Sequence, residues 1–468
     1  MKTHGHGIAF GTDGWRALIG EGFTVDRLRI VAQAFADWLA TTPQRRQPVL
    51  IGYDGRFGGE RFALAAARVL AGNGFRTAVV AGPTPTPAVS WRIARRGYGA
   101  GMMVTASHNP PAYSGVKVKP WFGGSPGSDV VDPIVAALGR RPPREGKAEA
   151  VSRVSFVDEY VAMLRRFVDL KAIRRLKGTV VSDPMGGAQA GLLARVLAGG
   201  GPRIHAIHDE IHPTFCGLTA PEPVESNLEA LKREVRRVRG ILGIATDGDG
   251  DRVALVADGG AFVTPHLVFA LLLIFMVRYR GVRGGVVKTV SGSFLLDRIA
   301  RTYNLPIHET PVGFKYICKL MMEDDIVMGG EESGGVGFKG YIPERDGLLA
   351  GLLALELLAK SGRTCRELIR DLTREFGASS YARIDAHHPT AQASLRRLIA
   401  SPPDRVGSDR VAQVNTRDGL KLIFADDSWL LFRASGTEPL LRVYAEAERP
   451  AGVRRLLAAG ARLAGVKG

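Results

Sequence analysis

The chain has little cysteine. Only three occur among 468 residues, and they are far apart, at Cys216, Cys318 and Cys365. No two of them form a CxxC pair, so the sequence indicates neither a disulfide framework nor a thiolate metal site. We expect each cysteine to fill space in a hydrophobic core.

Long hydrophobic runs are also missing. The longest, residues 267–277, is too short to cross a bilayer, which needs about 20 residues, and it predicts a buried helix instead. Residues 1–7 contain no apolar stretch of the kind found in signal peptides. We therefore expect a cytoplasmic protein without a membrane partner.

The chain has fewer acidic than basic residues: 46 Asp and Glu against 63 Lys and Arg, which gives a net charge of +17. Such a surplus is typical of proteins that bind nucleic acid or an anionic small molecule. The basic residues are spread along the chain, and no signature of a nucleic-acid-binding module occurs. We expect no nucleic-acid partner.

The pattern of strands and helices predicts several domains. A chain of 468 residues with 45% apolar residues can form three or four of them. Predicted strands alternate with helices as far as about residue 376, which is typical of α/β units with mixed, mostly parallel sheets. Closely spaced strands then predict a smaller antiparallel α+β unit. We expect domains at 1–153, 154–259, 260–376 and 377–468.

A polar turn follows the apolar run 100–104, which predicts a buried strand. Ligands of α/β sheets lie just beyond the carboxyl ends of strands, and Ser107 stands there. The alternating segment 115–119 predicts a strand that returns past Ser107 and carries Lys117. The alternative is a turn that only ends the strand.

Three carboxylates at alternate positions, Asp247, Asp249 and Asp251, follow another predicted strand. They can bend around one cation, and their hard oxygen ligands suit magnesium. An EF-hand is excluded because Arg252 and Asp258 stand where that loop needs Gly and Glu. An acidic surface turn is the alternative.

Two further turns carry polar groups. Residues 433–439, with Arg442, offer guanidinium, hydroxyl and backbone donors that suit a phosphate, although a hairpin loop is the alternative. Residues 331–335 place a carboxylate between glycines, which suits capture of sugar hydroxyls, although an N-cap-like turn explains them equally well.

Together these four stretches resemble the phosphohexomutase superfamily, the phosphoglucomutase/phosphomannomutase enzymes. They read Thr-Ala-Ser-His-Asn-Pro, Asp-Gly-Asp-Gly-Asp-Arg, Gly-Glu-Glu-Ser-Gly and Arg-Ala-Ser-Gly-Thr-Glu-Pro. They occur in the family's order, one per predicted domain, so the resemblance covers essentially the whole chain. It implies three α/β domains and a smaller C-terminal α+β domain around a central cleft.

The resemblance also implies residue roles. Ser107 is expected to carry the phosphoryl group, with Lys117 as the general acid/base, and this use of Lys117 needs a pKa lowered by a positively crowded cleft. The expected catalytic residues are Ser107, Lys117, His108 and Arg16. The expected ligands of Mg²⁺ are Ser107, Asp247, Asp249 and Asp251. The expected substrate-binding residues are Arg252, Lys288, Glu331, Ser333, Arg433, Ser435, Gly436, Thr437 and Arg442.

The implied activity is that of a phosphoglucomutase, which interconverts glucose 1-phosphate and glucose 6-phosphate through a phosphoserine and a bound hexose 1,6-bisphosphate. Residues 311–315 resemble the loop of phosphoglucomutases, whereas Gly335 replaces a histidine found in many members and no histidine follows Met185. A phosphomannomutase or phosphoglucosamine mutase is the alternative, a metal-dependent sugar-phosphate phosphatase a weaker one, and an inactive sugar-phosphate-binding module the non-enzymatic one. We expect a monomer or homodimer.

Overall fold

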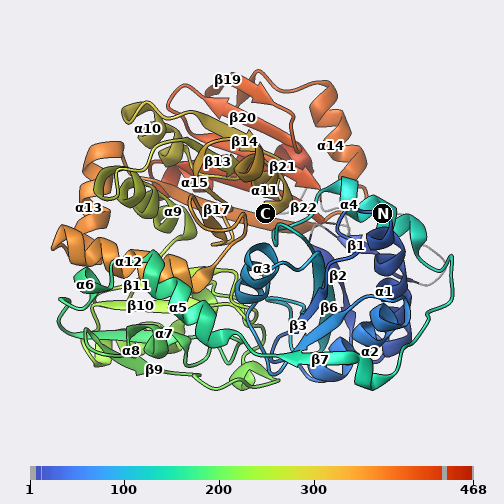
Figure 1. Ribbon diagram of the computed structural model, residues 1–468. Helices are drawn as coiled ribbons and strands as arrows, with labels where there is room; N and C mark the ends of the chain where they lie inside the picture. The colour runs from blue at the N-terminus through green and yellow to red at the C-terminus, as the bar shows by residue number, and fades with distance from the viewer. Residues whose placement is uncertain (1–6, 12, 435–439, 466–468) are drawn as a thin grey trace.

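The computed structural model describes residues 7–11, 13–434 and 440–465. It contains four sheets of seven, five, four and six strands. In Figure 1 they follow one another around the molecule, from the blue N-terminal unit through the green and olive units to the orange-red C-terminal unit. The expected fold class, three α/β units and a final α+β unit, is confirmed. We number these units one to four.

Unit one is a mixed sheet with strand order β1-β2-β6-β5-β3-β4-β7. Strands β5, β3, β4 and β7 are parallel, and β6 returns antiparallel to β5. Its strands are β1 (Phe10–Gly11), β2 (Gly14–Leu18), β3 (Val49–Tyr53), β4 (Thr77–Val80), β5 (Ala100–Val104), β6 (Tyr113–Pro120) and β7 (Val151–Val154). Its helices are α1 (Val25–Ala40), α2 (Gly59–Gly72), α3 (Thr86–Arg95) and α4 (Ser128–Ala137).

Unit two has strand order β12-β11-β10-β8-β9. Its strands are β8 (Thr179–Asp183), β9 (Arg203–Ala206), β10 (Leu242–Thr246), β11 (Val253–Ala257) and β12 (Ala261–Val263). Its helices are α5 (Val157–Phe167), α6 (Leu170–Ile173), α7 (Leu192–Leu197) and α8 (Glu229–Arg237). Because β7 ends at Val154 and β12 begins at Ala261, the first two sheets run slightly past residues 153 and 259.

Unit three has strand order β14-β13-β15-β16. Its strands are β13 (Gly285–Thr289), β14 (Ile307–Thr310), β15 (Ile326–Gly330) and β16 (Val336–Phe338). Its helices are α9 (Pro265–Ile274), α10 (Phe294–Thr302), α11 (Phe314–Glu323), α12 (Gly347–Ser361) and α13 (Cys365–Phe376). Asp346 caps α12 by accepting a hydrogen bond from the Leu349 backbone, which satisfies one of the unpaired N–H groups at the helix start.

Unit four is an antiparallel sheet with strand order β17-β22-β21-β20-β19-β18. Its strands are β17 (Ser380–His387), β18 (Arg405–Val406), β19 (Asp409–Asn415), β20 (Leu420–Phe424), β21 (Trp429–Ala434) and β22 (Leu440–Ala447). Its helices are α14 (Ala391–Ala400) and α15 (Pro450–Ala464).

The apolar run 267–277 forms most of α9 and the π-helical turn that follows it, and its residues from Val268 onward are buried, as expected. No helix in the described part of the chain is long and apolar enough to cross a membrane. Cys318 and Cys365 are buried, but the expectation is wrong for Cys216, which is half-exposed. Cys216 lies in a turn where the neighbouring Phe215 takes the core position.

The polar turns predicted in units one to three occupy one recurring topological position. Each follows a strand, β5, β10 or β15, that has a parallel neighbour on one side and an antiparallel returning strand on the other. In each unit the turn therefore leaves the carboxyl end of an interior strand, where the backbone is no longer paired and side chains can gather.

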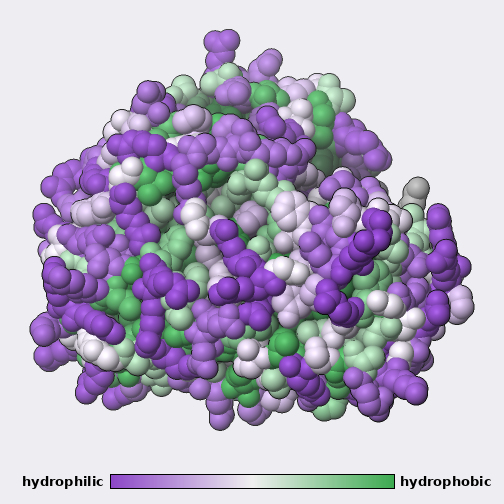
Figure 2. Space-filling model, in the orientation of Figure 1, coloured by the Kyte–Doolittle hydropathy of each residue, from purple (hydrophilic) through white to green (hydrophobic). Residues whose placement is uncertain are grey.

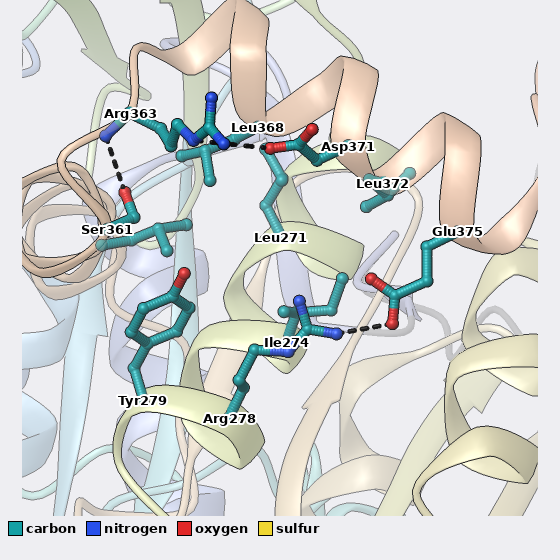
Figure 3. A pocket seen from close by; sticks show the side chains of 11 residues that line it. Leu271, Ile274, Arg278, Tyr279, Ser361, Arg363, Leu368, Asp371, Leu372 and Glu375 are labelled. Atoms are coloured by element: carbon teal, nitrogen blue, oxygen red, sulfur yellow. Dashed lines mark hydrogen bonds and ion pairs between the residues drawn. The ribbon is translucent and has the colours of Figure 1, made fainter.

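A cavity of about 180 Å³ lies between α9, α12 and α13. Figure 3 shows its leucine and isoleucine floor and its polar rim, where Arg278 pairs with Glu375 and Arg363 approaches Asp371. The face seen in Figure 2 is mostly hydrophilic, with its hydrophobic surface in small separate areas. None of the predicted site residues that the structure describes lines this cavity.

Candidate active site

Ser107 lies in the turn after β5 in a constrained conformation. Its φ is 51°, in the left-handed region that costs a non-glycine residue about 1–2 kcal/mol. The side chain is 1% exposed, and its hydroxyl donates to Asp247 Oδ2 at 2.8 Å. Two motifs 140 residues apart are thus in direct contact. The structure holds the Ser107 hydroxyl against the first of the three aspartates predicted to bind the metal.

The three carboxylates after β10 are fully buried, and their ligand oxygens all lie within 4.8 Å of one another. Burial, followed by the charges of Asp251 and Asp249, raises the pKa of Asp247 well above its ordinary value. Gly248 fits between the two motifs because a Cβ there would come within 2.8 Å of the Ser107 carbonyl oxygen. The loop therefore brings carboxylates together at an electrostatic cost.

The donor set fits a magnesium ion. Asp249 Oδ1 and Asp251 Oδ1 are buried without a hydrogen-bond partner among the residues that the structure describes, and such unpartnered buried oxygens are rare unless something else binds them. The opposite oxygens are already held, Asp249 Oδ2 by the Thr86 hydroxyl at 2.5 Å and Asp251 Oδ2 by Arg345 at 2.8 Å. Clustered hard oxygens with open lone pairs suit a small divalent cation.

Lys117 lies on β6, opposite Met103 of β5, and its ammonium is surrounded by carboxylates. Nζ is 2.8 Å from Asp249, 2.9 Å from Asp251 and 3.0 Å from Asp13. Burial favours a lower pKa, but these three charges outweigh it and the pKa is raised. The expectation of a lowered pKa in a positively crowded cleft is therefore wrong, because the nearest neighbours of Lys117 are negative.

Three of the predicted residues surround the Ser107 turn. Arg16, on β2, donates to the Asn109 side chain at 2.8 Å. His108 places Nδ1 3.5 Å from Ser107 Oγ, and burial, followed by the charges of Arg252 and Arg16, lowers its pKa well below the usual value. Arg252 itself pairs with Glu222 at 3.1 Å. Arg252 also donates its backbone N–H to Asp247 Oδ1 at 3.0 Å, so all three lie close to Ser107 or Asp247.

Glu331 follows β15 and reaches the same region through Arg345. Arg345 is 4% exposed and contacts Glu331 at 3.3 Å, Asp251 at 2.8 Å and Asp13 at 3.0 Å. It thus joins units one, two and three. A Cβ on Gly335 would lie 2.3 Å from Arg345 Cδ, so the arginine fills the space that a larger residue at 335 would need. Ser333 is half-exposed on the same turn.

Lys288 is placed differently from the other candidates. It is buried on β13, where its ammonium pairs with Asp297 and lies 3.7 Å from Glu309. Glu309 also pairs with Lys421 of unit four at 2.8 Å. The contacts of Lys288 are thus at the boundary of units three and four, not with the aspartate cluster, and its substrate-binding role stays a prediction.

Two arginines of unit four face each other across neighbouring strands, Arg433 on β21 and Arg442 on β22. Like charges opposite one another are unfavourable in a sheet, so the pair is typical of a place that receives an anion. Arg433 Nε donates to Asp418 at 2.8 Å, whereas Arg442 Nε has no hydrogen-bond partner among the described residues and lies 3.7 Å from Asp385 Oδ2. Ser435, Gly436 and Thr437 lie outside the described residues.

The sequence reasoning missed three residues that the structure places in the cluster. Asp13 contacts both Lys117 and Arg345, and Thr86 donates to Asp249. Asp13 lies in the glycine-punctuated loop before Arg16, which was a usable signal. Thr86 and Arg345 had no such local signal, because their partners in the aspartate cluster belong to a different unit of the chain.

Family models of four domains match consecutive parts of the chain. They are described as phosphoglucomutase/phosphomannomutase alpha/beta/alpha domain I at residues 7–143, domain II at 158–260, domain III at 265–376, and C-terminal domain at 396–463. Their order agrees with the four sheets.

Similar proteins cover nearly the whole chain. A phosphoglucomutase/phosphomannomutase of Thermococcus kodakarensis is 29% identical over 98% of both chains. A phosphoglucosamine/phosphogalactosamine mutase of Sulfurisphaera tokodaii is 28% identical, with 94% of this chain and 96% of that protein covered.

A solved structure also has the same fold over nearly the whole chain. A Thermus thermophilus protein described as a phosphomannomutase superposes with a TM-score of 0.87 and 35% identity, over 97% of this chain and 98% of that one. The protein therefore belongs to the phosphohexomutase superfamily, whose members are enzymes of the isomerase class.

Proposed function

We propose that this protein is a phosphoglucomutase that interconverts glucose 1-phosphate and glucose 6-phosphate, with Ser107 as the carrier of the phosphoryl group. The observation that carries the proposal is the contact between the buried Ser107 hydroxyl and Asp247 at 2.8 Å. A serine with this partner can bear a phosphate whose charge a cation on the carboxylates offsets. Phosphoryl transfer needs such positioning and charge stabilisation above all.

The proposed step balances as follows. A hydroxyl oxygen of the hexose monophosphate bonds to phosphorus while the bond from phosphorus to Ser107 Oγ breaks, which gives a bound hexose 1,6-bisphosphate. The sugar hydroxyl loses a proton and Ser107 Oγ gains one. The bisphosphate then turns end for end and returns its other phosphoryl group to Ser107.

Lys117 is assigned the proton-transfer role. Its raised pKa keeps the ammonium protonated, so it fits the donor that protonates the leaving Ser107 oxygen. The amine that remains would then take up the proton that the attacking sugar hydroxyl loses. Asp247, Asp249 and Asp251 would hold magnesium, which when bound supplies positive charge to the transferring phosphoryl oxygens. Glu331 and Ser333 are assigned to the sugar hydroxyls, and Arg433 and Arg442 to the phosphate that does not react.

The preference for glucose rests on the loop 311–315, which follows β14 beside the domain boundary. The Val312 backbone donates to Asp418 of unit four at 2.9 Å, and Asp418 also accepts from Arg433. The loop is thus tied to the proposed phosphate-binding arginine, a position from which it can contact the sugar. Relatives named for mannose and glucosamine phosphates make those sugars the main alternatives.

A substrate panel tests the proposal. Glucose, mannose and glucosamine 1-phosphates are each supplied with Mg²⁺ and a trace of the matching 1,6-bisphosphate, and both mutase product and free phosphate are measured. We expect the highest kcat/KM for glucose 1-phosphate and little phosphate release. Ser107→Ala should be almost inactive. Release of phosphate without isomerisation would identify a phosphatase, and a preference for mannose or glucosamine would reassign the substrate.

A further inference from the structure

The turn that carries Ser107 is built around a buried arginine. Arg56 is 3% exposed and stands two residues after Asp54, just beyond β3. Its terminal nitrogens donate to four backbone carbonyls between the Ser107 turn and the first residue of β6: Ser107 and Asn109 at 2.6 Å, Pro110 at 2.8 Å and Tyr113 at 2.9 Å. A guanidinium is suited to this because its donors are fixed in one plane.

The carboxylate beside Arg56 is connected to the same turn. Asp54 Oδ2 lies 3.3 Å from Arg56 Nε and accepts from the Thr105 hydroxyl at 2.5 Å. Thr105 Oγ1 in turn accepts from the Ser107 backbone N–H at 2.7 Å. Ser107 is thus held at its N–H through Thr105 and at its carbonyl by Arg56.

The other side of the guanidinium is covered from unit two. The ring of Phe215 lies 4.7 Å from Arg56 Cζ, as in a cation–π contact. Phe215 is fully buried and also approaches Gly248, since a Cβ there would lie 3.0 Å from the ring. One aromatic side chain therefore packs both on the arginine below Ser107 and on the loop of the predicted metal ligands.

We propose that Arg56, covered by Phe215, is a positioning residue that fixes the Ser107 turn in the conformation required for phosphoryl transfer. A simple structural ion pair would need only Asp54, yet four of the arginine's donations go to carbonyls of the turn. Ser107 needs this support because its left-handed φ is unfavourable for a serine. The inference rests on the proposed function only in its kinetic part.

The test compares Arg56→Lys with a matched control, Arg280→Lys. Arg280 also pairs with a carboxylate, Glu356, donates to the Phe167 carbonyl at 2.9 Å and packs on that ring, but it lies between other helices. Hydrogen exchange of the amides of residues 105–113 is measured beside kcat and KM. A lysine has one nitrogen and cannot replace two terminal nitrogens that serve four carbonyls.

For Arg56→Lys we expect the rate of amide hydrogen exchange in residues 105–113 to rise at least about tenfold. We also expect kcat to fall about 100-fold, the usual effect of a displaced reacting group, with little change in KM. Arg280→Lys should change neither. Phe215→Leu, which keeps the apolar cover but removes the ring, should show the same signs in weaker form and serves if Arg56→Lys does not fold.

Unchanged exchange at residues 105–113 would overturn the proposal, and so would faster exchange with an undiminished kcat. The two hypotheses fail separately. If the wild-type protein isomerises no hexose phosphate, the proposed function is refuted, while the exchange measurement still decides whether Arg56 holds the turn.

Discussion

A buried ion pair connects units one and three, and its contribution to the free energy of unfolding can be measured. Lys119 of β6 and Glu344, in the loop before α12, pair with both side chains fully buried. Glu344 Oε1 also accepts from the Arg345 backbone at 2.9 Å. Without Lys119, Glu344 keeps only Arg345, whose Nε lies 3.4 Å from Oε1 and which pairs with three other carboxylates as well. Breaking such a buried pair typically costs about 3–5 kcal/mol.

We therefore predict that Lys119→Met lowers the free energy of unfolding by about 3–5 kcal/mol. The double variant Lys119→Met/Glu344→Gln should recover most of this, because the glutamine carbonyl still accepts from the Arg345 backbone and no buried charge remains unpaired. A residual loss of about 1 kcal/mol is expected for the weaker hydrogen bonding.

The assay is urea unfolding followed by tryptophan fluorescence and by circular dichroism. Because a multidomain chain can unfold in more than one step, the comparison uses the first transition. Lys319→Met is the control, since Lys319 pairs with Glu323 on the surface, where ion pairs contribute little. If Lys119→Met is no more destabilising than Lys319→Met, or if the double variant is the weakest of all, the reasoning from buried charge is refuted.

Three further predictions concern the site. Burial raises the pKa of Glu331 to about 7, against the opposing charge of Arg345. The carboxylate proposed to accept hydrogen bonds from the sugar hydroxyls is therefore lost as the pH falls through that pKa, so KM should rise there in the wild type; a KM equally pH-dependent in Glu331→Gln would exclude this cause. Arg433→Ala should raise KM for the hexose phosphate about 10- to 100-fold through loss of a charged hydrogen bond, and an unchanged KM would place the phosphate elsewhere. Asp249→Asn should raise the Mg²⁺ concentration for half-maximal activity at least about tenfold, measured by titration after chelation, and an unchanged requirement would remove Asp249 from the ligand set.

The parts of the site that are local in sequence could be predicted. Ser107 and the three aspartates each lie within a few residues of the end of an apolar strand. The rule that ligands of α/β sheets lie beyond the carboxyl ends of strands therefore predicted where these residues lie in the fold. The alternation around Lys117 likewise predicted the returning strand β6, which pairs with β5. In these cases a short segment contains the strand, the turn and the reactive group together.

What depends on distant partners could not be predicted. Arg345 has no motif of its own, and its contacts come from three units. The charge around Lys117 was misjudged because Asp13 and the aspartate cluster reach it only after folding. Lys288 was placed near the substrate by resemblance, yet a lysine on an interior strand can face either side of the sheet, and this one faces Asp297.

The negatively charged surroundings of Lys117 are compatible with a cation bound to the same carboxylates. The ammonium of Lys117 and the cation would bind different carboxylate oxygens. Lys117 bonds to Oδ2 of Asp249 and Oδ2 of Asp251. The Oδ1 atoms of both residues are buried and have no hydrogen-bond partner within the described part of the chain. Each carboxylate is thus oriented through one oxygen by fixed protein donors and keeps the other open. A lysine and a divalent cation can therefore occupy the cluster together, with the charge of the cation offsetting the burial and the carboxylate repulsion that raise the pKa of Asp247.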